Sequence, residues 1–196
     1  MVVYCLVVLK EFNGKGAGKA LMNAAEEEAK SQGKKGLVTF GYRGEFWLLP
    51  ASFYERHGFE EVESYRVGSP GDSDVLDEIV LLWKPFDETA EVPKFPKSKY
   101  EFKPIPGKVV VDLFWDISCQ TINIEGERVK EVAEEFGDKV VFNEFPVHEP
   151  GVYLKCQRHR GIFINGKEIG WGHEAPKEGV REAIRKELNA NLERRE

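Results

Sequence analysis

The stretch that decides the fold is an apolar run, Val2 to Leu9, followed by the glycine-rich sequence Asn13-Gly14-Lys15-Gly16-Ala17-Gly18-Lys19. An alanine- and glutamate-rich segment with helical spacing, Ala17 to Gln32, comes next, and Gly33 is placed to end that helix. A strand, a glycine-rich turn and a helix in this order present several backbone N–H groups, and the positive end of a helix dipole, to an anion. The sequence therefore predicts a site for a pyrophosphate-bearing cofactor.

Spacing excludes two common phosphate-binding loops. A Walker A loop would need glycine at position 13 and Ser or Thr at position 20, where Asn13 and Ala20 stand. A dinucleotide-binding fingerprint that begins at Gly14 would need a third glycine at position 19, where Lys19 stands. Two interpretations stay open on the residues alone: a cofactor of another class, or a glycine-rich turn with no ligand.

Further elements follow in a fixed order. Leu37 to Phe40 is predicted to be a short strand. Within Pro50 to Phe59, Gly58 is placed to end a helix in the left-handed conformation, and Phe59 to start the next strand. Ile79 to Lys84 is predicted to be another strand. In the helix over Ala17 to Gln32, helical spacing gathers Leu21, Ala24, Ala25, Glu28 and Ala29 on one face.

These motifs resemble the GNAT N-acetyltransferase superfamily over roughly residues 2–86. Asn13 to Gly18 resembles its acetyl-CoA loop, Gln/Arg-x-x-Gly-x-Gly/Ala, with Gly16 and Gly18 at the small positions and Asn13 where Gln or Arg is usual. The helix that carries Phe-Tyr-Glu and ends in Gly-Phe, and a last strand that ends in Lys84-Pro85, are similar to the family's segments. The resemblance implies an α/β fold with part of the mixed sheet of a GNAT acetyltransferase.

The resemblance also implies a reaction, in which an amine attacks the thioester of acetyl-CoA. Tyr54 occupies the position of the family's tyrosine that protonates the departing CoA thiolate. The alternative for Tyr54 is an aromatic packing residue, and His57 is interpreted as a helix cap or a solvent-facing residue. The acceptor would be a small-molecule or peptide amine. The predicted cofactor residues are Val7, Val8, Leu9, Asn13, Gly14, Lys15, Gly16, Ala17, Gly18 and Lys19.

One departure from the family concerns the acceptor side. A GNAT domain has about three strands and two helices before the strand that Val2 to Leu9 resembles, and that segment holds no Asp or Glu to act as a base. Three explanations stay open: a longer chain, a second chain that completes the sheet, or CoA binding without turnover. An incomplete sheet exposes an edge, so a homo-oligomer formed through that edge is also expected.

Composition restricts the class of protein. The chain has 196 residues, a net charge of −6 and a pI near 5.4, which argue against a nucleic-acid partner. No run of about 20 apolar residues and no secretory signal is recognised, so we expect a cytoplasmic protein with no membrane partner. Three cysteines do not make a disulfide framework.

Proline density divides the chain. We predict a GNAT-like domain over residues 1–87, a proline-rich connector over 88–106 and a second α/β domain over 107–196. The last is predicted from strands at Lys108 to Phe114, Lys139 to Glu144 and Gly161 to Asn165, a hairpin turn at Asn165-Gly166, and helices at Glu125 to Phe136 and Pro176 to Leu192. This order is similar to thioredoxin, and the whole chain resembles the YoaP-like family of GNAT proteins.

Cys119 follows the first strand of the second domain, where thioredoxin-like proteins carry a reactive thiol, but Ile122 replaces the second cysteine of Cys-x-x-Cys. Three interpretations stay open: an inert thiol, a reactive thiol that pairs with Cys156, or a metal site with Cys156, His159 and His148. No metal is predicted. For the whole chain, an acetyl-CoA-dependent N-acetyltransferase is the first hypothesis, and a non-catalytic module that binds CoA or senses thiols or metals is the second.

Overall fold

The computed structural model describes residues 1–43, 49–67, 77–117, 120–170 and 175–193. The chain forms two compact units, Met1–Arg66 with Glu78–Phe95, and Val67–Asp77 with Pro96–Glu196. The predicted connector, residues 88–106, is therefore divided between them. Its first part belongs to the first unit because the backbone N–H of Phe95 donates to the Glu63 carboxylate (2.7 Å) and the Phe95 ring packs edge-on against Tyr65.

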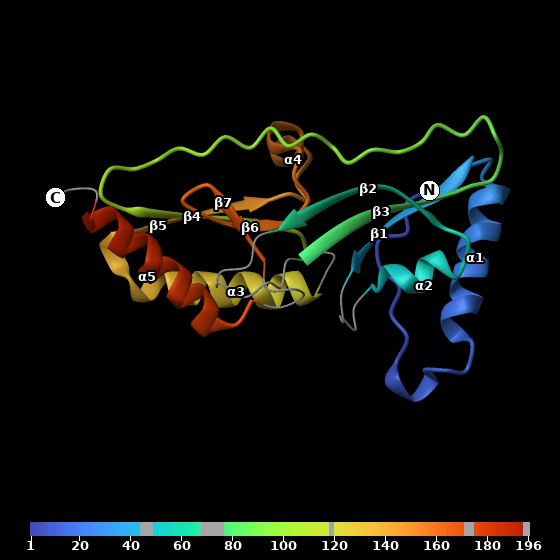
Figure 1. Ribbon diagram of the computed structural model, residues 1–196, viewed down its shortest axis with the longest axis horizontal. Helices are drawn as coiled ribbons and strands as arrows, with labels where there is room; N and C mark the ends of the chain where they lie inside the picture. Colours follow the sequence, from blue (N-terminus) through green and yellow to red (C-terminus); the bar gives the residue numbers. More distant parts are fainter. Residues whose placement is uncertain (44–48, 68–76, 118–119, 171–174, 194–196) are drawn as a thin grey trace. The chain divides into compact units, whose positions relative to one another are not determined.

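The first unit is a three-stranded sheet with two helices. Its elements in chain order are a short 3-10 helix η1 (Lys10–Phe12), α1 (Ala17–Ser31), β1 (Gly36–Arg43), α2 (Ala51–Glu55), β2 (Glu60–Val67) and β3 (Asp77–Pro85) (Figure 1). The strand order is β1-β3-β2, and β1 runs antiparallel to β3. The helices and strands predicted after residue 16 are confirmed, and β1 is longer than predicted.

Helix α1 packs through a narrower face than the sequence suggested. Met22, Ala25 and Ala29 contact the core, whereas Leu21 keeps 49% of its surface exposed. These three lie at i, i+3 and i+7, so they form one stripe. The prediction that Leu21 and Ala24 face the core was wrong, because apolar spacing alone does not say which of two overlapping stripes is covered.

The predicted strand over Val2 to Leu9 forms only its first residues. The Val3 N–H donates to the Val38 carbonyl (2.8 Å), the Val38 N–H donates to the Met1 carbonyl (2.9 Å), and Val2 makes a single parallel bridge to Val38. The Thr39 hydroxyl then donates to the Val3 carbonyl (2.8 Å) in place of a backbone amide. The ladder ends there, and residues 4–9 continue as irregular chain.

The second unit holds a four-stranded sheet. Its elements are β4 (Val109–Trp115), α3 (Gln120–Glu135), η2 (Gly137–Lys139), β5 (Val140–Pro146), α4 (Pro150–Cys156), β6 (Gly161–Ile164), β7 (Lys167–Ile169) and α5 (Lys177–Glu193). The strand order is β5-β4-β6-β7, with β4 parallel to β5 and antiparallel to β6. The predicted strands, helices and hairpin are confirmed, with Asn165 and Gly166 both at positive φ. Helix α4 was not predicted.

Helices cover both faces of this sheet. Val129 and Val132 of α3 and Ile184 of α5 pack in one core with alternate residues of β4. On the other face, Val152 and Cys156 of α4 and Tyr100 pack with Phe114. The predicted strand over 108–114 is therefore largely apolar, because it is buried on both faces. No helix among the described residues is long and apolar enough to cross a membrane.

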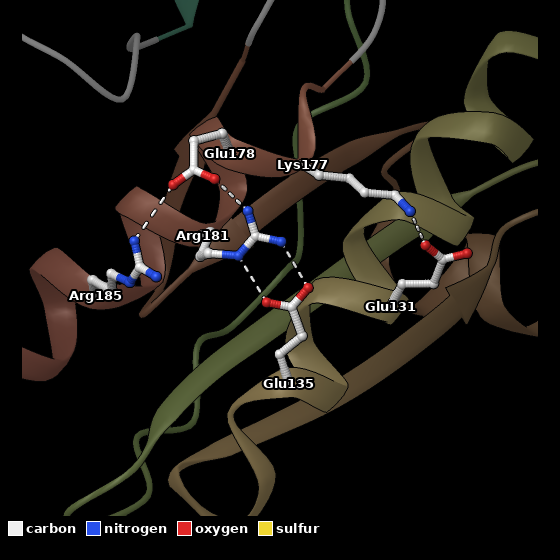
Figure 2. A network of polar contacts seen from close by, with 6 residues as sticks. All are labelled: Glu131, Glu135, Lys177, Glu178, Arg181 and Arg185. Carbon is white, nitrogen blue, oxygen red and sulfur yellow. Dashed lines mark hydrogen bonds and ion pairs between the residues drawn. The ribbon is translucent and has the colours of Figure 1, made fainter.

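An ion-pair network joins the two helices on one face (Figure 2). Arg181 of α5 donates from Nε and Nη2 to both carboxylate oxygens of Glu135 on α3, at 2.7 Å each, and it also pairs with Glu178. These contacts lower the pKa of Glu135 and raise that of Arg181. Lys177 pairs with Glu131, and Arg185 lies 3.4 Å from Glu178. The exposed pairs fix the relative orientation of the helices more than they stabilise them.

A carboxylate is buried in the middle of β4. Asp112 is 4% exposed, accepts a hydrogen bond from the Tyr100 hydroxyl (2.6 Å) and another from Asn143 Nδ2 (2.7 Å). Burial, and then the adjacent Asp112 carboxylate, raise the pKa of Tyr100, so its hydroxyl keeps its proton and serves as donor. These bonds hold the segment before β4 against the sheet.

Replacing Tyr100 by Phe leaves the buried carboxylate with one donor fewer. We expect Tyr100→Phe to lower the free energy of unfolding of the second unit by about 1–3 kcal/mol, the cost of an unsatisfied buried group. Hydrogen exchange of β4 peptides measures this unit alone. Tyr153→Phe, a half-buried tyrosine of α4, is the matched control, and equal protection in the two variants would contradict the role of the Asp112 contact.

Candidate functional site

The glycine-rich loop leads into helix α1. The first backbone N–H groups of this helix are not bonded within it. Gly14 (φ 72°) and Gly16 (φ 82°) both adopt the left-handed conformation, and Gly16 is the N-cap. The first backbone bond of the helix runs from the Ala20 N–H to the Gly16 carbonyl (3.0 Å). Within the described chain, the N–H groups of Ala17, Gly18 and Lys19 have no backbone acceptor, as expected for a first turn. This turn can bind an anion.

Gly18 allows α1 to approach α2 closely. A Cβ atom at this position would lie 3.1 Å from the Phe53 ring and 3.8 Å from the side chain of Val8. Only a residue without a side chain leaves the Phe53 ring where it is. The glycine therefore brings together the loop, the opening segment and α2.

Helix α2 is held against the end of β1. The Tyr42 N–H donates to the Leu49 carbonyl (2.9 Å), and a Cβ on Gly41 would lie 2.9 Å from the backbone of Ala51. Leu49 has φ 48° and precedes a proline, a combination that is costly for a branched side chain. The strained turn starts α2 at a fixed place and so directs its aromatic residues into the first unit.

These segments enclose a pocket of about 560 Å³ in the first unit. The opening segment forms one wall, the glycine-rich loop and the start of α1 form the second, and α2 forms the third. The lining residues are Leu6, Val7, Val8, Phe12, Asn13, Gly14, Gly16, Ala17, Gly18, Lys19, Leu49, Pro50, Phe53, Tyr54, Arg56 and His57. The pocket exists because the opening segment leaves β1 after Val3.

Most predicted site residues line this pocket. Leu9 and Lys15 do not: Leu9 is 60% exposed, and the Lys15 ammonium lies 5.8 Å from the Phe12 ring. Sequence reasoning missed Arg56 and His57, which lie two and three residues after Tyr54. For His57, the position about one turn after a predicted site residue is the signal that could have found it.

Tyr54 is almost completely buried, with 1% of its surface exposed. Burial raises its pKa to about 12, and a hydrogen bond with the Thr39 side chain opposes this shift only in part. The Tyr54 hydroxyl therefore keeps its proton throughout the physiological range. It is a hydrogen-bond donor at the inner end of the pocket, and a weaker acid than an exposed tyrosine.

His57 is half-buried in the pocket wall, and of the two alternatives that the sequence left open, its contact with a carbonyl of α2 supports the helix cap. Its Nδ1 lies 2.7 Å from the Phe53 carbonyl, and its ring lies 4.4 Å from the Phe53 ring. A carbonyl can only accept, so Nδ1 carries a hydrogen, and in the neutral ring the lone pair is then on Nε2. That nitrogen can accept a proton.

The charge of the described lining residues suits an anionic ligand. Lys19 and Arg56 contribute positive charge, Asn13 and His57 are polar, and none of these described residues is a carboxylate. The apolar parts of the wall, which include Val7 and Phe53, suit an extended uncharged chain. A ligand with a diphosphate at one end and an aliphatic arm fits both parts.

The cysteines do not form a site within the described residues. Cys156 is buried at the end of α4, where its Sγ donates to the Val152 carbonyl (3.2 Å), and the predicted partner Cys119 lies outside the described residues. His148 packs edge-on against Trp115 (5.3 Å), and burial lowers the pKa of His159. Among the residues that the structure describes, no three His, Cys, Asp or Glu side chains are close enough to hold a metal.

Comparison with known families agrees with the site. Residues 2–61 match the family model described as the acetyltransferase (GNAT) domain. This stretch includes the opening segment, the loop, α1, β1 and α2, and so all of the pocket residues. The family match thus covers the part of the first unit that forms the pocket, and it spans less than a third of the chain. Among curated proteins, none matches the chain.

Solved structures match the same part of the chain. A protein from Agrobacterium tumefaciens described as an acetyltransferase is 28% identical, with 43% of this chain and 57% of that chain covered and a TM-score of 0.34. A GNAT family acetyltransferase from Elizabethkingia anophelis with acetyl-CoA bound is 16% identical (43% and 60% covered, TM-score 0.35). The ribosomal-protein-S18-alanine N-acetyltransferase from Escherichia coli is 20% identical (48% and 60%, TM-score 0.35). The chain thus spans less than two thirds of each.

The left-handed conformation of Gly16 predicts a cost for any other L-residue. We expect Gly16→Ala to lower the free energy of unfolding by about 1–2 kcal/mol, although nothing lies within 4 Å of the added methyl group. Gly16→Asn is the control, because asparagine tolerates this conformation better. Hydrogen exchange of α1 peptides measures both, and a loss in Gly16→Asn as large as in Gly16→Ala would argue against the backbone explanation.

Proposed function

We propose that the first unit binds acetyl-CoA in the pocket and transfers its acetyl group to an amine. The observation that carries this proposal is the convergence of three features on one pocket: the amides at the start of α1, the cationic Lys19 and Arg56, and the buried donor Tyr54. The match of residues 2–61 to the GNAT acetyltransferase domain supports it. The acceptor is proposed to be a small-molecule or peptide amine, and the cytoplasmic location stays a prediction.

In the proposed complex, the diphosphate of CoA binds the N–H groups of Ala17, Gly18 and Lys19. Charge-assisted hydrogen bonds to amides at a helix N-terminus are strong and need no side chain. The pantetheine arm then follows the opening segment toward Tyr54, past Val8 and Val7. This places the thioester at the inner, buried end of the pocket.

The proposed reaction joins the amine nitrogen to the acetyl carbon and breaks the carbon–sulfur bond. The proton that the nitrogen loses goes to Nε2 of His57 or to water. With a phenol pKa of about 12 and a thiol pKa of ~8.5, complete transfer of the Tyr54 proton to the thiolate costs about 5 kcal/mol. We therefore propose that Tyr54 donates a hydrogen bond to sulfur as negative charge develops there.

A second candidate function is CoA binding without turnover. The specific observation that favours it is the absence of any carboxylate among the described lining residues, together with the low acidity of Tyr54. Effective catalysis also requires the amine to be held in line with the thioester. The two functions share the binding step and differ in the transfer step.

For the second unit we propose a thioredoxin-like accessory domain, as in the YoaP-like family. The strand order β5-β4-β6-β7, with one antiparallel hairpin, and helices on both faces support this proposal. Ile122 stands where a second cysteine would be needed, so we do not assign dithiol exchange to it.

Binding is tested first. Isothermal titration of the full chain with acetyl-CoA should give micromolar affinity, and Gly18→Val should weaken it at least tenfold, because the branched side chain displaces the Phe53 ring into the pocket. The control is Gly151→Val, at a helical glycine of the second unit that has nothing within 4 Å. Equal affinities in the two variants, or no heat with the wild type, would remove the proposed site.

Catalysis is tested by replacing the buried hydroxyl. Tyr54→Phe should lower kcat for acetyl transfer about 10- to 100-fold and leave the affinity for acetyl-CoA unchanged. Because a raised pKa keeps the phenol protonated up to about pH 11, the wild-type rate should not fall from pH 8 to 10 through loss of this proton. Binding without any transfer to a panel of amines would favour the second candidate function.

A further inference from the structure

We propose that two copies of this chain associate through an antiparallel pairing of their opening segments, residues 2–8, with Cys5 of one copy opposite Cys5 of the other. The proposal concerns an interaction surface that shares Leu6, Val7 and Val8 with the pocket wall, and it does not rest on the proposed function. Three observations carry it: the exposure of the segment, its open backbone groups, and the symmetry of its sequence about Cys5.

The segment exposes apolar side chains to an unusual extent. Val2 is 56% exposed, Tyr4 47%, Val7 61% and Leu9 60%, and Cys5 is also exposed. Scattered exposed apolar residues are ordinary, but here four lie within eight consecutive positions. Such a patch marks an interface more often than a solvated surface.

The backbone of the same segment offers hydrogen bonds. Among the described residues, the N–H and C=O groups of Leu6, Val7 and Val8 have no backbone partner. The sequence is rich in valine, which favours extended chain. A valine-rich extended segment with open amides and carbonyls is a template for another strand.

The sequence itself identifies that strand as a second copy. In an antiparallel register centred on Cys5, Val2 lies opposite Val8, Val3 opposite Val7 and Tyr4 opposite Leu6. An antiparallel pair of identical strands is related by a twofold axis, which requires a self-complementary sequence. Every opposed pair is apolar, and two of the three are Val–Val pairs.

Charge also favours self-association at this place. The chain carries a net charge of −6, which makes two copies repel one another in general. The side chains of residues 2–9 carry no charge, so the patch is a neutral area on an acidic chain. A partner with a basic surface would be drawn elsewhere, whereas a second copy can approach here without repulsion.

Pairing at this register places the two Cys5 residues on the axis. Directly opposed residues of antiparallel strands have Cα atoms about 4.5–5.5 Å apart, which is within the range that a disulfide can span. In the same register, Val7 of one copy lies opposite Val3 of the other. The two Val7 residues are then four positions apart along the strands, a distance of about 13 Å. In this register, a disulfide between the two copies can therefore form at position 5 but not at position 7.

The first experiment measures mass in solution. Sedimentation equilibrium of the full chain in reductant should give twice the mass of one chain at tens of micromolar. Val7→Lys, which puts a charge into the pairing at an exposed position, should give single chains. The control is Val92→Lys, at a valine of the first unit that is 52% exposed outside the segment, and it should stay dimeric. A wild-type monomer, or a Val7→Lys dimer, would overturn the proposal.

The second experiment tests the register in a Cys119→Ser background. Oxidised glutathione should take two electrons and two protons from a pair of Cys5 thiols, leaving a disulfide-linked dimer and two reduced glutathione molecules. Cys5→Ser/Val7→Cys keeps one exposed thiol in the segment and should cross-link at least tenfold more slowly. Faster linkage through position 7, or no linkage through position 5 in a dimeric sample, would overturn the assigned register.

Discussion

The hydrogen bond from the Thr39 hydroxyl to the Val3 carbonyl sets the geometry of the first unit. Up to Val3 the opening segment pairs with β1, and beyond it the carbonyl that would continue the ladder is already bonded to a side chain. The segment then diverges from β1, and α2 closes the space that is left. The pocket and the exposed apolar patch are two consequences of this one divergence. The same Thr39 also bonds the hydroxyl of Tyr54.

Glycine spacing predicted the conformation of the loop because the causes of that conformation are local. Gly14 and Gly16 need the left-handed conformation, and Gly18 needs to be small where two helices approach, so each is visible in the sequence. The cofactor role of Lys15 stays untested, but its ammonium lies beside Phe12 and not in the pocket wall. A lysine's direction depends on its neighbours in space, and no spacing rule contains that information.

Other differences have the same origin. The run from Val2 to Leu9 has the composition of a strand, but a strand also needs a partner strand along its length, and among the described residues the bridge to a strand is the one between Val2 and Val38. Helix α4 escaped prediction because seven residues after a proline show too little periodicity to be recognised. The other elements of the second unit were predicted because β4 is apolar except for Asp112, and because α3 and α5 are long enough for their spacing to be unambiguous.

Burial gives Tyr54 opposing properties for a role in catalysis. It fixes the hydroxyl in a dry environment, where a hydrogen bond to a developing thiolate is strongest, and the same burial raises the phenol pKa to about 12, which opposes complete proton transfer. A preorganised donor that never needs to ionise resolves this conflict. In the proposed reaction such a donor would stabilise charge on sulfur without having to be regenerated, and the proton that the amine loses would go to an acceptor such as Nε2 of His57.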